Sequence, residues 1–326
     1  MPAKRNVLDL IGRTPLLAIR SFDTGPCELF LKLESQNPGG SIKDRVGLYM
    51  IEAAEREGRL RPGATLVEAT AGNTGLGLAL VAGRKGYRLQ LVIPDKMSRE
   101  KIFHLRAMGA EVVMTRSDVP KGHPDYYQDR AARLARETPN AFYVSQFSNP
   151  ANPQAHEETT APEIWEQMQH RLDAVVCGVG TGGTLTGLSR FFARADPHVD
   201  MVLADPQGSA LAGCVRTGRI EPTGRSWLVE GIGGDYVPPV CDLSRVRRAL
   251  SVSDAESFRT CRELLRGEGI LGGTSTGTLL AAALRYCREQ KSPRRVVTLV
   301  CDSGNKYLSK VYNDYWMLDQ GFLARE

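Results

Sequence analysis

Two glycine-rich loops constrain the fold of this chain more than any other feature, because each one follows a short apolar run and precedes a helical pattern. The first loop is residues 70–75 (TAGNTG), and the second is residues 178–184 (GVGTGGT). A helix that begins at such a loop leaves backbone N–H groups without intrahelical partners, and its dipole adds partial positive charge. Glycines allow a ligand to approach that backbone closely. The sequence therefore predicts two binding sites for anionic groups.

Short apolar runs alternate with helical patterns along most of the chain. This alternation predicts an α/β protein with open, mostly parallel sheets flanked by helices. We predict strands at residues 29–33, 65–68, 89–93, 111–115, 174–177, 201–204 and 296–300. We predict helices at residues 45–58, 74–86, 99–108, 125–137, 159–168, 184–195, 254–266 and 277–289. A polar, proline-punctuated stretch at residues 140–154 interrupts the pattern, and we place a lobe boundary there.

Length, charge and hydropathy exclude several classes of function. The chain has 326 residues, which is long enough for two lobes, and its net charge of +5 is too small and too dispersed to indicate nucleic-acid binding. Its apolar runs are far shorter than the roughly 20 residues that cross a bilayer. Charged and glycine residues interrupt the region where a signal peptide has its hydrophobic segment. We therefore expect a cytoplasmic protein that does not bind membranes.

The seven cysteines and five histidines are scattered along the sequence. No two cysteines have the C-x-x-C spacing, and the histidines form no cluster. We expect neither a disulfide framework nor a metal site.

A lysine and a third glycine-rich turn add chemistry to the two anion sites. Lys43 lies where a helix is predicted to begin, and the positive end of the helix dipole favours the neutral amine that a Schiff base requires. Ser275, within residues 272–277 (GGTSTG), either caps a helix or places a neutral hydroxyl beside the nitrogen of a pyridine ring. An amine nucleophile with two anion sites predicts a pyridoxal-phosphate enzyme that acts on an amino acid.

The same loops also permit other interpretations. Gly178, Gly180 and Gly183 satisfy the G-x-G-x-x-G pattern after a predicted strand. Asp205 ends the next strand, where nicotinamide-dependent dehydrogenases carry a ribose-binding carboxylate. The first loop also suits a simple helix cap. A dehydrogenase therefore stays an alternative, although the donors crowded at residues 182–184 favour a monophosphate.

Six segments occur in the order typical of one enzyme family. They are residues 37–45 (NPGGSIKDR), 71–75 (AGNTG), 146–156, 178–187, 230–238 and 272–277. Over residues 6–322 the chain thereby resembles the cysteine synthase and cystathionine β-synthase family of fold-type II pyridoxal-phosphate enzymes. The resemblance implies a two-lobed fold similar to tryptophan synthase β. Its smaller, mobile substrate-binding lobe is expected at residues 46–145, and its larger cofactor-binding lobe at residues 1–45 and 146–326.

The resemblance also assigns roles to single residues. Lys43 is implied to be the catalytic Schiff-base lysine of pyridoxal 5′-phosphate. The implied ligands of the cofactor are Asn73 at the ring 3′-oxygen, Ser275 at the ring nitrogen, and Gly180, Thr181, Gly182, Gly183 and Thr184 at the phosphate. The implied substrate contacts are Thr70, Ala71, Gly72, Asn73, Thr74 and Gln146 at the α-carboxylate, and Gly231 at the active-site mouth.

The implied reaction is β-replacement, in which serine or O-acetylserine loses its β-substituent and a thiol takes its place. Residues 205–209, 230–233, 302–303 and 316–322 favour the cystathionine β-synthase branch, with homocysteine as the thiol. Residues 146–153 and 163–166 are more similar to cysteine synthase, which uses sulfide. A non-catalytic binding relative is a further alternative.

Two departures from the family pattern bear on the substrates. Ala71 stands where the family usually has Ser, and Gly234 stands where the cystathionine branch often has Tyr. These changes leave the preferred leaving group and thiol open. The family implies a homodimer, and the segments present lead us to expect neither haem nor C-terminal effector control.

Overall fold

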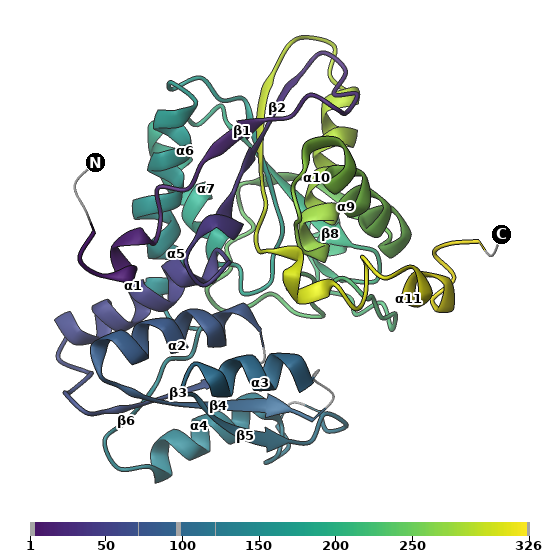
Figure 1. Cartoon of the computed structure of the whole chain (residues 1–326). Coiled ribbons are helices and arrows are strands. Elements are labelled where there is room, and N and C mark those ends of the chain that lie inside the picture. The colour runs from purple at the N-terminus through teal and green to yellow at the C-terminus, as the bar shows by residue number, and fades with distance from the viewer. Residues whose placement is uncertain (1–3, 71, 96–98, 121, 325–326) are drawn as a thin grey trace. The chain divides into compact units, whose positions relative to one another are not determined.

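Two β-sheets organise the chain, and each belongs to a separate compact unit (Figure 1). The computed structural model describes residues 4–70, 72–95, 99–120 and 122–324. The first unit comprises Met1–Gly12 and Asn37–Ala155, and the second comprises Arg13–Gln36 and His156–Glu326. The mobile lobe at residues 46–145 stays a prediction, because it concerns which part moves when substrate binds.

The first unit contains a four-stranded parallel sheet in the order β5-β4-β3-β6. Because side chains alternate along a strand, Leu66 and Leu91 face the helices α1 (Lys43–Arg56) and α2 (Asn73–Lys85). Val67 and Val92 pack on the other face against Ala131 of α4 (Tyr127–Glu137). Both faces of the central strands are therefore covered, which explains their nearly continuous apolar sequences. The strands are β3 (Thr65–Ala69), β4 (Arg88–Pro94), β5 (Glu111–Thr115) and β6 (Ala141–Tyr143).

The second unit contains a six-stranded sheet in the order β1-β2-β10-β7-β8-β9. Strand β1 runs antiparallel to β2, and the other neighbours are parallel. All four residues of β7 are buried, as expected for the interior of a parallel sheet. The strands are β1 (Leu16–Ala18), β2 (Glu28–Lys32), β7 (Ala174–Cys177), β8 (Asp200–Pro206), β9 (Val246–Val252) and β10 (Arg295–Leu299).

Helices connect the parallel strands in both units (Figure 1). In the first unit they are α1 (Lys43–Arg56), α2 (Asn73–Lys85), α3 (Arg99–Ala107), α4 (Tyr127–Glu137) and α5 (Ala151–Ala155). In the second unit they are α6 (Ala161–Gln167), α7 (Gly183–Ala195), α8 (Leu211–Thr217), α9 (Asp254–Glu268), α10 (Thr274–Arg288) and α11 (Asp314–Asp319). Within the described ranges, we find no helix with the length and apolar character of a membrane span.

The α/β class and each predicted strand and helix are confirmed, with ends that shift by a few residues. The sequence analysis missed short or polar elements: β1, β6, β9, α5, α8 and α11. Strand β9 carries two consecutive arginines at a sheet edge, so it lacks the apolar run that marks the other strands. The stretch at residues 140–154 contains β6 and all but the last residue of α5, and it ends one residue before the observed boundary between the units.

Candidate functional site

Lys43 is the first residue of α1, and it is half-buried. The turn before it is fixed by the buried Asp44, whose Oδ2 accepts the N–H of Gly39 at 2.5 Å. Helix α2 lies close to this end of α1, since a side-chain carbon at Gly77 would lie 2.6 Å from the carbonyl oxygen of Lys43. Glycine at that position therefore brings the backbone of α2 against the first turn of α1.

Helix α2 begins at Asn73 within the first glycine-rich loop, one residue before the predicted start at Thr74. Gly72 precedes the helix, and its N–H donates to Thr70 Oγ1 at 3.2 Å. The buried Thr74 donates its hydroxyl hydrogen to Oε1 of Gln146 at 2.6 Å. The structure thus brings Gln146 to the loop from 72 residues away in the sequence. Ala71, a further predicted substrate contact, lies outside the described residues.

Glu68 is a site residue that the sequence analysis missed. It is fully buried in β3, where its Oε2 accepts the N–H of Gln146 at 3.0 Å and its Oε1 accepts the N–H of Ala69 at 2.8 Å. Burial raises its pKa to about 7, although these backbone hydrogen bonds act in the opposite direction. The available signal was a single acid in the apolar run TLVEA, two residues before the loop.

The raised pKa of Glu68 predicts a pH-dependent stability. The folded chain holds this proton up to about pH 7, whereas the unfolded chain releases it near the ordinary pKa of 4.5. Between these values the unfolded state binds fewer protons, so the free energy of unfolding falls as pH rises. Because of this one group, the free energy of unfolding falls by on the order of 3 kcal/mol over that pH range. Urea unfolding at pH 5 and pH 8 should show that Glu68→Gln weakens the dependence, and equal slopes in both proteins would contradict the assignment.

The second glycine-rich loop follows β7 and ends where α7 begins at Gly183. Gly182 has φ +88°, a left-handed conformation that favours glycine. Helix α7 has 13 residues, so the first-turn N–H groups and the dipole can hold a phosphate at residues 180–184. Thr181 is buried, and Oγ1 of Thr184 lies 3.3 Å from Nε2 of His156.

His156 was not assigned a role by the sequence analysis. It is fully buried in a π-helical turn (His156–Thr160), and its Nδ1 lies 3.0 Å from Oγ1 of Thr160. The imidazole thereby connects that turn to Thr184 at the start of α7. Only the fold reveals this link, because 28 residues separate the two positions.

Gly231 lies next to the second loop. A side-chain carbon at Gly180 would overlap the carbonyl oxygen of Gly231, so only glycine allows this approach. Gly231 itself has φ +87°, and Gly233 donates its N–H to the carbonyl of Val179 at 2.8 Å. Glycine at position 180 therefore leaves the loop backbone accessible to a phosphate, and a larger residue there would collide with Gly231.

Ser275 is the second residue of α10, and only 4% of its surface is exposed. Its neighbour Thr274 accepts the N–H of Glu230 at 3.0 Å. The Ser275 hydroxyl at this helix start can donate one hydrogen bond and accept others. It fits the expected contact with a cofactor ring nitrogen.

The predicted site residues fall into two groups. Lys43, Thr70, Gly72, Asn73, Thr74 and Gln146 lie in the first unit, and Gly180–Thr184, Gly231 and Ser275 lie in the second. Within each unit the structure brings together residues that are distant in sequence: Gln146 with Thr74, and Gly180 with Gly231.

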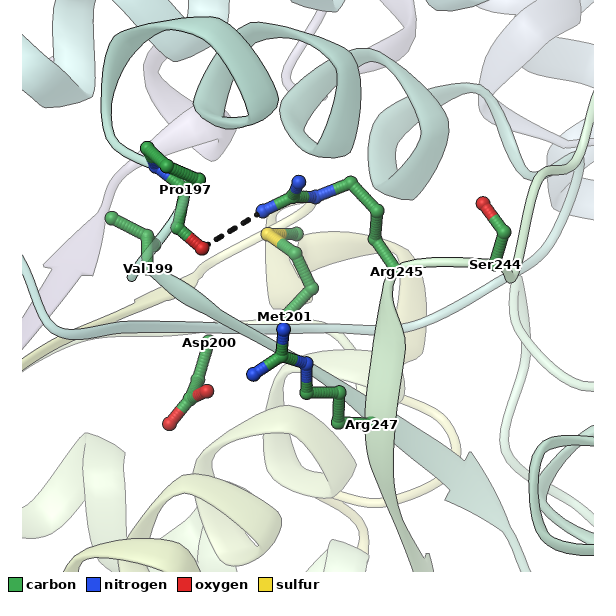
Figure 2. A pocket seen from close by; sticks show the side chains of 7 residues that line it. All are labelled: Pro197, Val199, Asp200, Met201, Ser244, Arg245 and Arg247. Carbon is green, nitrogen blue, oxygen red and sulfur yellow. Dashed lines mark hydrogen bonds between the residues drawn. The ribbon is translucent and has the colours of Figure 1, made fainter.

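A small cavity of about 100 Å³ in the second unit contains none of these residues (Figure 2). Arg245 reaches across it to the carbonyl oxygen of Pro197 at 3.2 Å, and Asp200, Met201 and Arg247 line it. It lies where β8 and β9 begin. Ligands of open parallel sheets bind at the carboxyl ends of the strands, where the glycine-rich loops lie, so we do not assign this cavity to the site.

Comparison with known proteins defines the class. A family profile described as "Pyridoxal-phosphate dependent enzyme" matches residues 7–302. The chain belongs to this family of enzymes, and its cofactor is pyridoxal 5′-phosphate. The two helix starts preceded by glycine and the buried Ser275 hydroxyl fit that cofactor.

Two curated relatives have the same name. The chain is 41% identical over 322 residues to "Cystathionine beta-synthase" of Dictyostelium discoideum, covering 98% of this chain and 64% of that protein. It is 43% identical over 324 residues to the same-named protein of Oryctolagus cuniculus, covering 98% and 58%. The chain therefore spans about three fifths of the length of these relatives.

Solved structures agree on the fold. A hydrogen sulfide-producing enzyme from Fusobacterium nucleatum has a TM-score of 0.86 and 38% identity, covering 94% of this chain and all of that one. An O-ureido-L-serine synthase has a TM-score of 0.88 and 34% identity, covering 97% and 100%. These likenesses confirm the predicted fold-type II architecture.

The dehydrogenase alternative is wrong. The family assignment excludes it, and the structure gives the physical reason at Asp205. This side chain is fully buried, and its Oδ2 accepts the N–H of Ala212 in α8 at 2.8 Å, so it does not face a ribose. Burial also raises its pKa to about 6.

Proposed function

We propose that this enzyme catalyses β-replacement on L-serine or O-acetyl-L-serine with a thiol, and that homocysteine is the preferred thiol and cystathionine the product. The observation that carries the proposal is the hydrogen-bonded group of Thr74 and Gln146 beside the loop at residues 70–74, in the same unit as Lys43. This arrangement suits an amino-acid carboxylate. Identity of 41–43% to cystathionine β-synthases supports the choice of thiol.

In this proposal the residues of the two loops hold the cofactor and the substrate. Lys43 attaches the cofactor through Nζ, Asn73 contacts the ring 3′-oxygen, and Ser275 contacts the ring nitrogen. The phosphate binds the N–H groups and hydroxyls of Gly180, Thr181, Gly182, Gly183 and Thr184 at the start of α7. The substrate α-carboxylate binds Thr70, Gly72, Asn73, Thr74 and Gln146, together with Ala71, and Gly231 borders the site.

The expected reaction depends on which group takes the proton from the substrate Cα. When bound, pyridoxal 5′-phosphate withdraws electrons from the substrate Cα and acidifies its proton. The amine of Lys43 takes that proton, and the β-substituent leaves Cβ as hydroxide or acetate. The sulfur of the thiol then bonds to Cβ, Lys43 returns its proton to Cα, and the thiol proton ends on the leaving group. A neutral serine hydroxyl at the ring nitrogen limits electron withdrawal, which favours elimination at Cβ over transamination. Because Lys43 and the carboxylate loop lie in the same unit, binding of the carboxylate would orient the substrate relative to that amine.

Sulfide is the second candidate nucleophile, because a structural neighbour with 38% identity is a hydrogen sulfide-producing enzyme. A comparison of four substrate pairs separates the candidates. Purified enzyme receives serine or O-acetylserine with homocysteine or sulfide, and mass spectrometry identifies the product. The proposal predicts the highest kcat/KM with homocysteine and cystathionine as the product. If sulfide gave product and homocysteine did not, the enzyme would be a cysteine synthase. If none of the four pairs gave product, the proposal of β-replacement would be overturned.

We also propose that the enzyme is a cytoplasmic homodimer. The resemblance to its family supports the dimer, and the cysteines support a reducing compartment, since all seven lie in the described ranges and none is bonded to another. Light scattering of the purified holoenzyme should give twice the mass of one chain. The mass of a single chain would contradict the dimer.

A further inference from the structure

We propose that Glu68 is a positioning residue that holds the turn at residues 145–146 in the conformation that binds the substrate α-carboxylate. The inference rests on the proposed function, because Glu68 acts through the carboxylate site assigned there. Three features of the first unit carry it: the burial of Glu68, the strained turn that it contacts, and the orientation that this turn gives to Gln146.

Glu68 occupies a costly position. It lies in the fourth place of β3, where all five residues are buried, and its own side chain has no exposed surface. A carboxylate in such a position loses its hydration and must be compensated by hydrogen bonds. Among the described residues, the compensation comes from the backbone N–H groups of Ala69, Ser145 and Gln146. A carboxylate has the acceptor capacity for all three, which a neutral amide lacks.

The turn that Glu68 contacts is strained. Ser145 has φ +54°, in the left-handed region that residues other than Gly, Asn and Asp seldom adopt. Such a conformation persists only where the surroundings fix it, and it costs on the order of a hydrogen bond. The Ser145 carbonyl also accepts the N–H groups of Ser148 and Asn149, both at 2.9 Å. The buried carboxylate holds this turn from one side and the following turn holds it from the other.

The turn at residues 145–146 determines which way the side chain of Gln146 points. Its N–H donates to Glu68 at 3.0 Å, its carbonyl accepts from Asn152 Nδ2 at 2.9 Å, and its Oε1 accepts from Thr74 at 2.6 Å. With Oε1 engaged by a hydroxyl, the other end of the amide, Nε2, presents two hydrogens. A pair of donors next to the start of α2 suits a carboxylate ligand. Glu68 therefore acts on substrate binding without touching the substrate.

The test is the variant Glu68→Gln in the holoenzyme, assayed at pH 8, where Glu68 with its pKa of about 7 is a carboxylate. One acceptor oxygen becomes an NH₂ group that faces a backbone N–H, so two donors oppose each other and the turn relaxes. We expect KM for the amino-acid substrate to rise about tenfold, as for the loss of one hydrogen bond to a charged group, with kcat within about threefold. The affinity for L-alanine, which has no leaving group, should fall by the same factor when followed by the cofactor absorbance.

A matched control uses another glutamate of the same unit. Glu111 is exposed at the start of β5, where it accepts from Gln90 Nε2 at 2.8 Å. Glu111→Gln makes the same chemical change without touching the turn, and we expect unchanged KM, kcat and L-alanine affinity. If Glu68→Gln does not fold, Glu68→Asp keeps the charge but withdraws the oxygens by one methylene, and it should raise KM in the same way.

A double-variant cycle separates positioning from a general structural role. In a Gln146→Ala background the turn no longer positions an amide group, so adding Glu68→Gln should change KM by less than about twofold. The same tenfold rise in both backgrounds would overturn the inference, as would an unchanged L-alanine affinity in Glu68→Gln. L-alanine binding does not require β-replacement, so the failure of the proposed reaction and the failure of this inference give different results.

Discussion

Replacing Lys43 with alanine is expected to abolish turnover while leaving the fold intact. Lys43 begins α1 and is half-buried, so its side chain contributes little to the packed core. Without its amine the chain has no group in the assigned place to bind the cofactor covalently or to take the proton from Cα. Loss of a nucleophile that is also the base lowers kcat by roughly 10³-fold or more. The measurement is single-turnover product formation, with circular dichroism to confirm folding.

Two further variants make this prediction specific. Lys43→Arg keeps the positive charge but cannot form the imine, and we expect it to be as inactive as Lys43→Ala. Lys85→Ala removes a lysine that pairs with Glu55 at 2.8 Å on α1, and we expect full turnover and a loss of at most about 1 kcal/mol in unfolding free energy. Normal turnover in either Lys43 variant would contradict the mechanism.

Gly180→Ala is expected to cause the second largest effect, a loss of cofactor affinity. The added carbon would overlap the carbonyl oxygen of Gly231, which is backbone and has no rotamer to move away. Displacing the loop costs about 1–3 kcal/mol, as for other overpacked sites. If that cost falls on the bound state, affinity for pyridoxal 5′-phosphate drops roughly 5- to 150-fold. Titration of the apoenzyme with the cofactor measures the change directly.

Gly83→Ala is the matched control for this substitution. Gly83 is exposed in α2, and a side-chain carbon there would meet no atom within 4 Å. Alanine favours the helix over glycine by about 0.5–1 kcal/mol, so this variant should be slightly more stable and bind cofactor normally. Equal cofactor affinities in Gly180→Ala and Gly83→Ala would contradict the assignment of residues 180–184 to the phosphate.

The fold could be predicted wherever burial leaves a pattern in the sequence. Strand β7 is covered on both faces, so its apolar run is unbroken, and in β3 the apolar residues are interrupted by the buried Glu68. The glycine-rich loops mark the starts of α2 and α7 in the sequence. In the second loop, Gly182 has a left-handed backbone conformation that favours glycine. Strand β6 has three partly buried residues and carries no such signal, and its place in the sheet comes from pairing with β3.

The site could be predicted only as far as local sequence reaches. Lys43, Asn73 and Ser275 lie at helix starts that the sequence marks, and the structure places each of them there. Glu68 and His156 depend on contacts with residues 78 and 28 positions away, and nothing in the sequence joins these pairs. A buried acid in an apolar strand was the available hint, because such a residue requires a partner.

The most direct test is to locate the covalent attachment of the cofactor. The holoenzyme is reduced with borohydride and digested with trypsin, and the modified peptide is sequenced by mass spectrometry. We predict one labelled peptide, residues 33–45, carrying a phosphopyridoxyl group on Lys43, because the modified lysine resists cleavage. A label on a different lysine, or no label after incubation with excess pyridoxal 5′-phosphate, would contradict the account.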